Sequence, residues 1–228
     1  MTTADIHTHT TYSLDSIIRP QELVMSAEHT GIDIVCVTDH GIFSENVGLE
    51  SFNNKNKKPL VIRGVELATS NGELIIFGLK NNFWEELKND MELLPPVQAV
   101  ISAVNSFNGV AIWAHPFRDY NVTNYNTDYK AFSGINIMET LNGHNSKAEN
   151  STARSYAKKH GFKMVGGSDA HRPGEVAKTL TLFKDDIETE SEFILALKNS
   201  EYTPIKLEDF KGKDLKQLLD LHLSKDYN

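Results

Sequence analysis

Cysteine is nearly absent from this sequence of 228 residues, and no long hydrophobic run interrupts it. The single cysteine, Cys36, excludes an intramolecular disulfide framework and a cysteine-rich zinc knuckle. It lies in the apolar run 34–37, a position that predicts a small buried side chain. No stretch approaches the about 18–20 apolar residues that a membrane-spanning helix needs. The first residues, MTTADIHTHT, lack the basic and apolar regions of a secretory signal, so we expect a cytoplasmic protein.

Basic residues are also in the minority. Lysine and arginine number 23 against 31 aspartates and glutamates, which gives a formal net charge of −8. This balance argues against a broad nucleic-acid-binding surface, because such a surface needs many cations to neutralise phosphates. It leaves room for a local basic pocket that holds one phosphate. The 39% hydrophobic and 24% charged residues are typical of a globular protein, and the length predicts one domain over residues 1–228.

Short apolar runs alternate with amphipathic stretches along the whole chain. Strands separated by helices of about 10–15 residues predict βα units and a parallel sheet or barrel. The predicted strands are Ala4–Thr8, Asp33–Thr38, Pro59–Leu67, Glu73–Leu79, Gly109–Ala114, Ile135–Thr140, Lys163–Gly166 and Ala177–Phe183. The predicted helices are Pro20–His29, Ser44–Asn53, Val97–Phe107, Ser146–His160, Ser191–Lys198 and a last one near Asp214–His222.

Polar residues that bind metals follow nearly every predicted strand. In βα barrels the strand ends and the loops after them converge on one face and build the active site. Three of the nine histidines, His29, His160 and His222, have ordinary helical explanations. The other six fall at or just after strand ends: His7, His9, His40, His115, His144 and His171. This sorting predicts a metal site.

The residue types indicate which metals and which chemistry. His7 and His9 are two apart on a strand, so their side chains point the same way and can hold one ion together. Imidazoles and carboxylates without thiolates suit Zn, Mn or Fe. Glu66 and Asp169 are the natural bridges, because a carboxylate offers one oxygen to each of two ions. Two or three ions close together would polarise a phosphoryl oxygen and lower the pKa of a bound water, which is then the expected nucleophile.

Other polar residues near the strand ends are candidates for handling a substrate. Arg118 and Arg172 each follow a histidine motif and offer a planar fork to a phosphate, and an ordinary loop salt bridge is the alternative for both. Asn142 is a further candidate for substrate binding, and His144 for donating a proton to the leaving group. Asp39 is interpreted as a partner of a metal ligand or as a cap.

Five motifs occur in a fixed order: HTHTTYSLDS, VTDHG, GVELAT, AHPFR and GGSDAH. Together they resemble the PHP (polymerase and histidinol phosphatase) superfamily, over about residues 5–183. The resemblance implies a distorted seven-stranded βα barrel, completed by residues 184–228, and a metal-dependent phosphoesterase. It places one ion between His7, His9, Glu66 and Asp169. It places a second ion at Glu66 and His115, and a third at Asp15, His40 and His171.

One position departs from the family pattern. Many relatives have a histidine in the strand after the glutamate motif, where this chain has Ile75. The second ion then has fewer ligands, and three outcomes stay open: weak binding, recruitment of Glu139, or no second ion. We therefore expect two or three ions.

The leading functional hypothesis is a phosphatase that acts on a small-molecule phosphate monoester through a metal-activated water. In it, Asp169 or His171 manages the proton of the attacking water. The alternatives are a phosphodiesterase or exonuclease acting on nucleotides or short oligonucleotides, and a non-catalytic metal-binding module.

Overall fold

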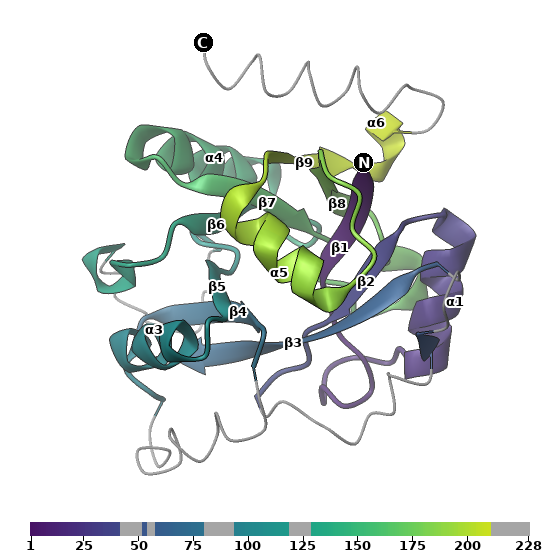
Figure 1. The fold of residues 1–228 in the computed structure, drawn as a ribbon, viewed down its shortest axis with the longest axis horizontal. Helices are drawn as coiled ribbons and strands as arrows, with labels where there is room; N and C mark the ends of the chain where they lie inside the picture. The colour runs from purple at the N-terminus through teal and green to yellow at the C-terminus, as the bar shows by residue number, and fades with distance from the viewer. Residues whose placement is uncertain (42–51, 54–57, 80–93, 119–128, 211–228) are drawn as a thin grey trace.

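The computed structural model describes residues 1–41, 52–53, 58–79, 94–118 and 129–210. In this part of the chain nine strands form one sheet, in the order β7-β6-β5-β4-β3-β2-β1-β8-β9. The strands are β1 Thr2–Thr8, β2 Ile34–Val37, β3 Leu60–Thr69, β4 Gly72–Phe77, β5 Val110–Trp113, β6 Ile137–Asn142, β7 Lys163–Gly167, β8 Thr179–Phe183 and β9 Tyr202–Lys206. The helices are α1 Pro20–Thr30, α3 Val97–Ser106, α4 Lys147–His160, α5 Glu190–Asn199 and α6 Leu207–Phe210 (Figure 1).

The sheet is mixed rather than parallel throughout. Strands β1, β2 and β3 pair in parallel, as do β5, β6 and β7. Strand β4 is antiparallel to both β3 and β5, because only the turn at residues 70–71 links β3 to β4 and a parallel connection needs a dozen or more residues. Strand β8 is antiparallel to β1, and β9 to β8.

The sheet curls until β7 meets β1 and β8, which nearly closes a barrel. The backbone N–H of Asp169, just after β7, donates to the carbonyl of His7 at 2.7 Å. The N–H of Gly166 donates to Oγ1 of Thr181 at 2.9 Å. Gly167 lies so close to β1 that an added Cβ would come within 2.5 Å of the Cβ of His7. The pair Gly166-Gly167 is therefore explained by close backbone approach, and the predicted distorted βα barrel is confirmed.

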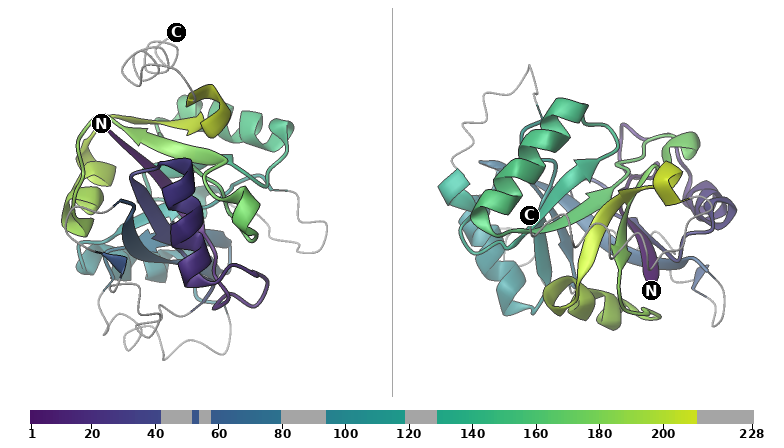
Figure 2. Two further views of the ribbon diagram at one scale, coloured as in Figure 1. Left: turned by 90° about the vertical axis from the view of Figure 1, so that its right-hand side faces the viewer. Right: turned by 90° about the horizontal axis from the view of Figure 1, so that it is seen from above.

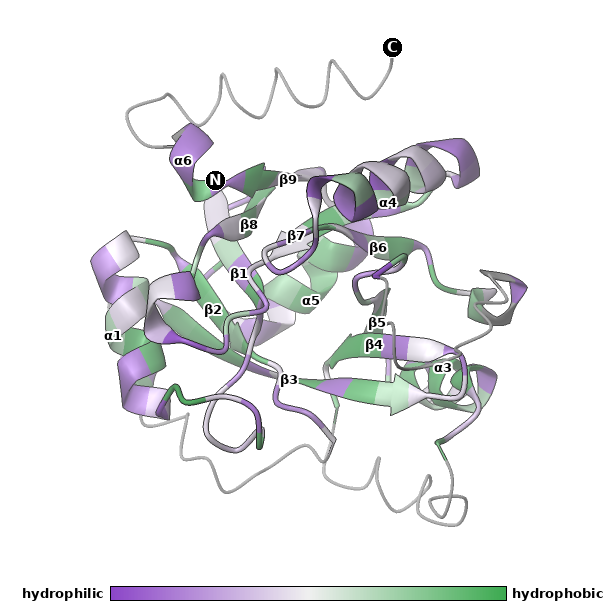
Figure 3. Cartoon of the chain, turned by 180° about the vertical axis from the view of Figure 1, so that it is seen from behind, coloured by the Kyte–Doolittle hydropathy of each residue, from purple (hydrophilic) through white to green (hydrophobic). Residues whose placement is uncertain are grey.

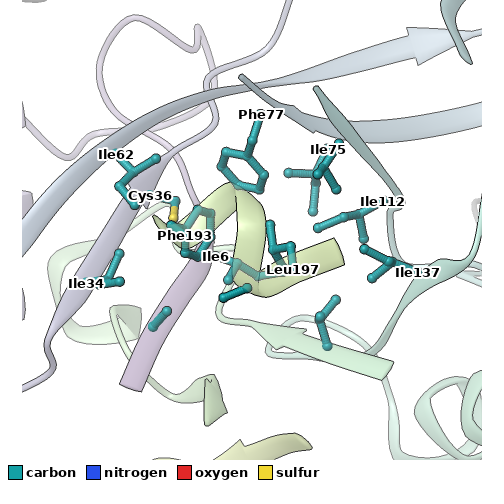
Figure 4. Packing of buried hydrophobic residues seen from close by; sticks show 14 of the residues in the cluster. Ile6, Ile34, Cys36, Ile62, Ile75, Phe77, Ile112, Ile137, Phe193 and Leu197 are labelled. Carbon is teal, nitrogen blue, oxygen red and sulfur yellow. The ribbon is translucent and has the colours of Figure 1, made fainter. Parts of the chain in front are cut away.

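Apolar side chains from the strands fill the barrel, and α5 covers one end of it (Figures 1 and 4). Phe193 and Leu197 of α5 are fully buried in this core. The ring of Phe193 packs edge-on against Phe77 with centroids 5.2 Å apart. The N–H of Ile187 donates to Oγ1 of Thr2, so α5 lies at the end where β1 begins. The opposite end, where β1 finishes, is left for the polar residues.

Two further clusters of buried apolar residues attach the outer helices. Helices α1 and α3 lie on opposite sides of the barrel (Figure 2), and Figure 3 shows hydrophobic residues along β2 and β3 and hydrophilic ones on α4 and α6. Helix α1 begins at Pro20 and ends at Gly31, whose φ of 75° is the left-handed cap that glycine favours. Helix α4 begins with a capping box in which Ser146 Oγ accepts from the N–H of Glu149.

All eight predicted strands and four of the six predicted helices are present, with boundaries shifted by at most two residues. The predicted helices Ser44–Asn53 and Asp214–His222 fall largely or wholly outside the described residues. Strand β9 and α6 were not predicted, because Glu201–Glu208 mixes charged residues with a proline and shows no clear period. Among the described helices none is long and apolar enough to span a bilayer.

Cys36 provides a test of the barrel core. Its side chain has no exposed surface, and burial raises the pKa of its thiol well above 9.0. We expect the native protein to resist a thiol reagent such as Ellman's reagent at pH 8, and one thiol per chain to react after unfolding in guanidinium. Rapid, complete reaction of the native protein would contradict the packing described here.

Candidate metal centre

The predicted metal-binding residues meet at the end of the barrel where β1 finishes. Each comes from a strand end or from the loop that follows it, as the barrel geometry requires. His7 is on β1, His9 and Asp15 follow it, His40 follows β2, Glu66 is on β3, His115 follows β5, and Asp169 and His171 follow β7. Bridges between residues 8 and 170 and between residues 40 and 66 fix these segments side by side.

The central group consists of His7, His9, Glu66 and Asp169, all buried. The Nε2 atoms of His7 and His9 are 3.1 Å apart, and each lies 3.2 Å from Oε2 of Glu66. Oδ1 of Asp169 lies 3.5 Å from Nε2 of His7 and 3.2 Å from Nε2 of His9. Four ligand atoms at about 2.0–2.1 Å from a tetrahedral zinc ion lie about 3.3 Å from one another, so this group fits such an ion.

The other ring nitrogens of the two histidines are already occupied by acceptors. Nδ1 of His7 lies 3.0 Å from Oε1 of Glu139, and an ionised carboxylate only accepts. Nδ1 of His9 lies 3.1 Å from Oγ of Ser13, whose hydroxyl donates to Asp39 and therefore accepts from the ring. Both Nδ1 atoms thus donate, and the lone pair of each neutral ring points at the other ring and at two carboxylates. A cation, either protons or a metal ion, must lie among them.

The close approach of the two histidines to the two carboxylates shifts the pKa values of all four groups. Burial alone would lower the pKa of both histidines, but Glu66 and Asp169 outweigh it and raise the pKa of His7 well above 6.5 and that of His9 to about 9. Burial alone would raise the pKa of Glu66 and Asp169, but the histidines hold both well below their usual values. The carboxylates therefore stay ionised, as metal ligands must be.

A second group surrounds His115, where the resemblance implied a second ion. Nε2 of His115 lies 2.7 Å from Oε1 of Glu66 and 3.6 Å from Oε2 of Glu73. Glu73 was not predicted. It precedes Ile75 by two residues on β4, so it shares a face of the strand with the position where relatives carry a histidine. The fully buried Ile75 belongs to the apolar barrel core.

Glu139 is the alternative that the sequence left open for the second ion. Its Oε1 faces His7, and its Oε2 accepts from the N–H of His115 at 2.9 Å and from Nδ2 of Asn142 at 3.1 Å. Both oxygens are therefore engaged. In this geometry Glu139 orients His7 and the His115 backbone. Glu139 with His7 and His115, and Glu73 with Glu66 and His115, are both groups that could hold an ion, so both carboxylates stay candidates.

The third group brings Asp15, His40 and His171 together at a more open position. Oδ2 of Asp15 lies 3.2 Å from Nε2 of His40 and 3.4 Å from Nε2 of His171. The ring of His9 packs between the other two rings, with centroids 4.4 Å from His40 and 4.3 Å from His171. Nδ1 of His171 donates to the carbonyl of Asp169, which leaves its Nε2 as the free ligand atom. Burial and the nearby His9 lower the pKa of His171.

Arg118 and Asn142, both predicted to bind substrate, are tied to Asp169. Nη2 of Arg118 donates to Oδ2 of Asp169 at 2.5 Å and to Oδ1 of Asn142 at 2.7 Å. Asn142 also donates to Glu139 and Asp169 and accepts from the N–H of His144. All four hydrogen-bonding positions of the Asn142 amide are used, so we reassign Asn142 from substrate binding to holding the carboxylates in place.

His144 and Arg172 lie at the rim of the site and share a carboxylate that was not predicted. Nε2 of His144 lies 3.2 Å from Oε2 of Glu175, and Nη1 of the exposed Arg172 lies 3.5 Å from its Oε1. Glu175 also accepts from the N–H of His171. The ring of His144 lies 5.6 Å from that of His171. The sequence RPGE carries a signal for Glu175, because a proline followed two residues later by a glutamate is typical of a helical first turn.

Two buried aspartates hold the loops that carry the ligands. Asp39 accepts from the N–H and hydroxyl of Thr10 and from Ser13, so it supports the loop around His9, as interpreted from the sequence. Asp5, which was not singled out, accepts from Ser168 and from the N–H of Ala177, and burial raises its pKa to about 6. The only sequence signal for Asp5 is its place two residues before His7.

The backbone is strained at two of the ligands. His115 has a φ of 24° and Asp169 a φ of 56°, in the left-handed region that residues other than glycine rarely adopt. Such conformations persist where the surrounding structure enforces them, commonly at functional sites. Here Glu139 holds the N–H of His115, and the carbonyl of His7 holds the N–H of Asp169.

Comparisons with known proteins agree with this arrangement. A family model described as PHP-associated matches residues 147–202. The chain superposes on a metal-dependent phosphoesterase, so described, of Bifidobacterium adolescentis with a TM-score of 0.57 and 16% identity, covering 75% of this chain and 88% of that one. These matches show that the chain has the fold of PHP-type phosphoesterases, and its five motifs resemble those of the PHP superfamily.

Two further proteins match the chain. The lesion-specific endonuclease PfuEndoQ of Pyrococcus furiosus has a similar fold, with a TM-score of 0.62 and 15% identity over 89% of this chain and 57% of that one. An uncharacterized protein of Methanocaldococcus jannaschii is 27% identical over 124 residues, which are 50% of this chain and 67% of that protein.

Replacing Glu139 tests whether it orients His7. We expect Glu139→Gln to weaken binding of Zn²⁺ or Mn²⁺ by about 10- to 100-fold, because an amide no longer fixes Nδ1 of His7 as the donor. The measurement is metal titration by calorimetry, with thermal unfolding to show that the fold is kept. The exposed Glu188→Gln is the matched control, and equal affinities for both variants would refute the role.

Proposed function

We propose that this protein is a member of the PHP superfamily and a metal-dependent phosphatase that hydrolyses a small-molecule phosphate monoester. The observation that carries the proposal is the sharing of Glu66 among three groups of ligands. One oxygen of Glu66 faces His115, and the other faces His7, His9 and His40. A single buried carboxylate in contact with four imidazoles suits a centre of two or three neighbouring divalent ions.

The donor set fits Zn, Mn or Fe, which would supply a nucleophilic water of lowered pKa and neutralise charge on the phosphoryl group. His7, His9, Glu66 and Asp169 hold the buried position. His115, Glu66 and Glu73 hold the second, and Asp15, His40 and His171 the open third. The exposure of the third group favours it as the side from which a phosphate enters.

The remaining polar residues take positioning and proton-transfer roles in the proposal. Asp169 and His171 are the candidates to accept the proton of the attacking water. His144, half-exposed and paired with Glu175, is placed at the rim to protonate the leaving oxygen. Arg118 fixes Oδ2 of Asp169, and Arg172 on the rim is free of the buried network and suited to a substrate phosphate.

A phosphodiesterase is the second candidate, because the fold is similar to that of a lesion-specific endonuclease. The net charge of −8 favours a small substrate over a long polyanion. The two activities differ in whether a monoester or an internal diester is cleaved, and a substrate panel separates them directly.

Glu73 is proposed as the ligand that takes the place of the family histidine at Ile75. We expect Glu73→Gln to reduce the number of tightly bound ions by one, measured by elemental analysis after dialysis against a weak chelator. The ions at the buried group should be retained. A metal content equal to that of the unchanged protein would assign Glu73 no role as a ligand.

Activity on a panel of phosphate esters tests the function. Metal-loaded protein should release phosphate from monoesters faster than it cleaves a dinucleotide or a cyclic nucleotide. We expect Asp169→Asn and His9→Ala each to lower kcat by more than about a hundredfold, since even the loss of a residue that only orients a ligand costs about 10- to 100-fold.

The exposed Asp209→Asn is the matched control and should retain activity. Faster cleavage of the dinucleotide would favour the phosphodiesterase. Tight metal binding without hydrolysis of any ester would favour a non-catalytic module.

A further inference from the structure

A pocket lies beside the metal centre, and none of the candidate metal ligands lines it. It has a volume of about 720 Å³ and lies between the first half of α4, the start of β8 and the end of β9. Pockets of about 300–1,000 Å³ are the size that small-molecule ligands occupy. Its walls are formed by Leu141, Asn142, Gly143, Asn145, Lys147, Asn150, Ser151, Arg154, Lys178, Thr179, Lys206, Leu207 and Glu208.

Positive charge is concentrated in this pocket although the chain as a whole is acidic. Four cationic side chains line it, against the single carboxylate of Glu208, which pairs with Lys206 at 3.3 Å. Within the described part of the chain, Lys147, Arg154 and Lys178 form no ion pair. Like charges gathered without partners raise the free energy of the protein, and an anionic ligand would lower it.

The cations reach the pocket from separate elements of regular structure. Lys147 and Arg154 are seven residues apart on α4, two turns along one face of the helix. Lys178 directly precedes Thr179, which pairs with Lys206 across β8 and β9. The cations are therefore held apart around a cavity and do not form a loose cluster on one flexible loop.

Neutral groups complete the lining. Asn145 and Ser151 offer hydrogen-bond donors, and the buried Nδ2 of Asn145 has no partner among the described residues. Leu141 and Leu207 provide apolar surface. We propose that this pocket binds a phosphorylated small molecule of nucleotide size, with two or more phosphate charges on the cations and its apolar part against the leucines.

The pocket shares a wall with the metal centre. The side chain of Asn150 makes two hydrogen bonds to the backbone of Asn142. Its Nδ2 donates to the Asn142 carbonyl at 3.1 Å, and its Oδ1 accepts from the Asn142 N–H at 3.0 Å. Oδ1 of Asn145 accepts from Nε of Arg118 at 2.7 Å. The proposed ligand would lie behind the residues that hold Asp169, at a site distinct from the ions.

Calorimetric titration with the non-hydrolysable α,β-methylene analogue of adenosine diphosphate tests the proposal. The metal-loaded full chain is compared with Arg154→Gln combined with Lys178→Gln, with Lys159→Gln on α4 outside the pocket, and with His9→Ala. We expect the double variant to weaken binding at least about tenfold, which is the loss of about 1.4 kcal/mol. Lys159→Gln and His9→Ala should stay within about twofold of the unchanged protein.

Three results would overturn the proposal. The first is no binding of the nucleotide, and the second is binding that His9→Ala removes and the double variant leaves intact, which would place the nucleotide at the ions. The third is binding of a single-stranded oligonucleotide in place of the nucleotide, with dependence on Arg154 and Lys178, which would make the pocket part of a nucleic-acid surface.

Discussion

The structure depends on the need to balance the charge of one buried carboxylate. Glu66 is almost fully buried, which alone would raise its pKa, yet His7, His115 and His9 hold the pKa well below its usual value and keep the carboxylate ionised. Two of those rings have their other nitrogen committed as a donor, so their lone pairs face the carboxylate. A buried, unpaired charge is costly, so the carboxylates need a positive partner. A cation is such a partner, and it also binds the Nε2 lone pairs of the histidines. A metal centre is the simplest consequence.

Barrel closure is what brings the charges together. Strand β7 meets β1 through the contact between the Asp169 N–H and the His7 carbonyl, and this places the GGSDAH motif beside the HTH motif, about 160 residues earlier in sequence. Gly167 permits the approach because a Cβ there would strike His7 and Glu139. The apolar core under α5 stabilises the closed barrel from the opposite end. The same strands therefore carry the packed core at one end and the polar site at the other.

The apolar period was sufficient for the strands and most helices, because it is a local signal, whereas the distorted barrel followed from the resemblance of five motifs to a known family. The structure brings the strand-end histidines and carboxylates together. The sequence was not sufficient for the residues whose role depends on register. Glu73 comes close to His115 because β4 runs antiparallel to β5, which sets Leu74 opposite Trp113 and lets the N–H of Ala114 donate to the carbonyl of Glu73. Asn142 was taken for a substrate ligand, because its four hydrogen bonds come from segments 24 to 27 residues away and from its own loop.

The central claim is that Glu66 organises neighbouring divalent ions. Anomalous diffraction from crystals grown with Zn²⁺ or Mn²⁺ measures this most directly. The account predicts at least two anomalous peaks about 3.5–4 Å apart, each in contact with Glu66, one of them also with His7 and His9. Crystals whose ions lie elsewhere, with the His7, His9, Glu66 and Asp169 group free of any peak, would contradict it.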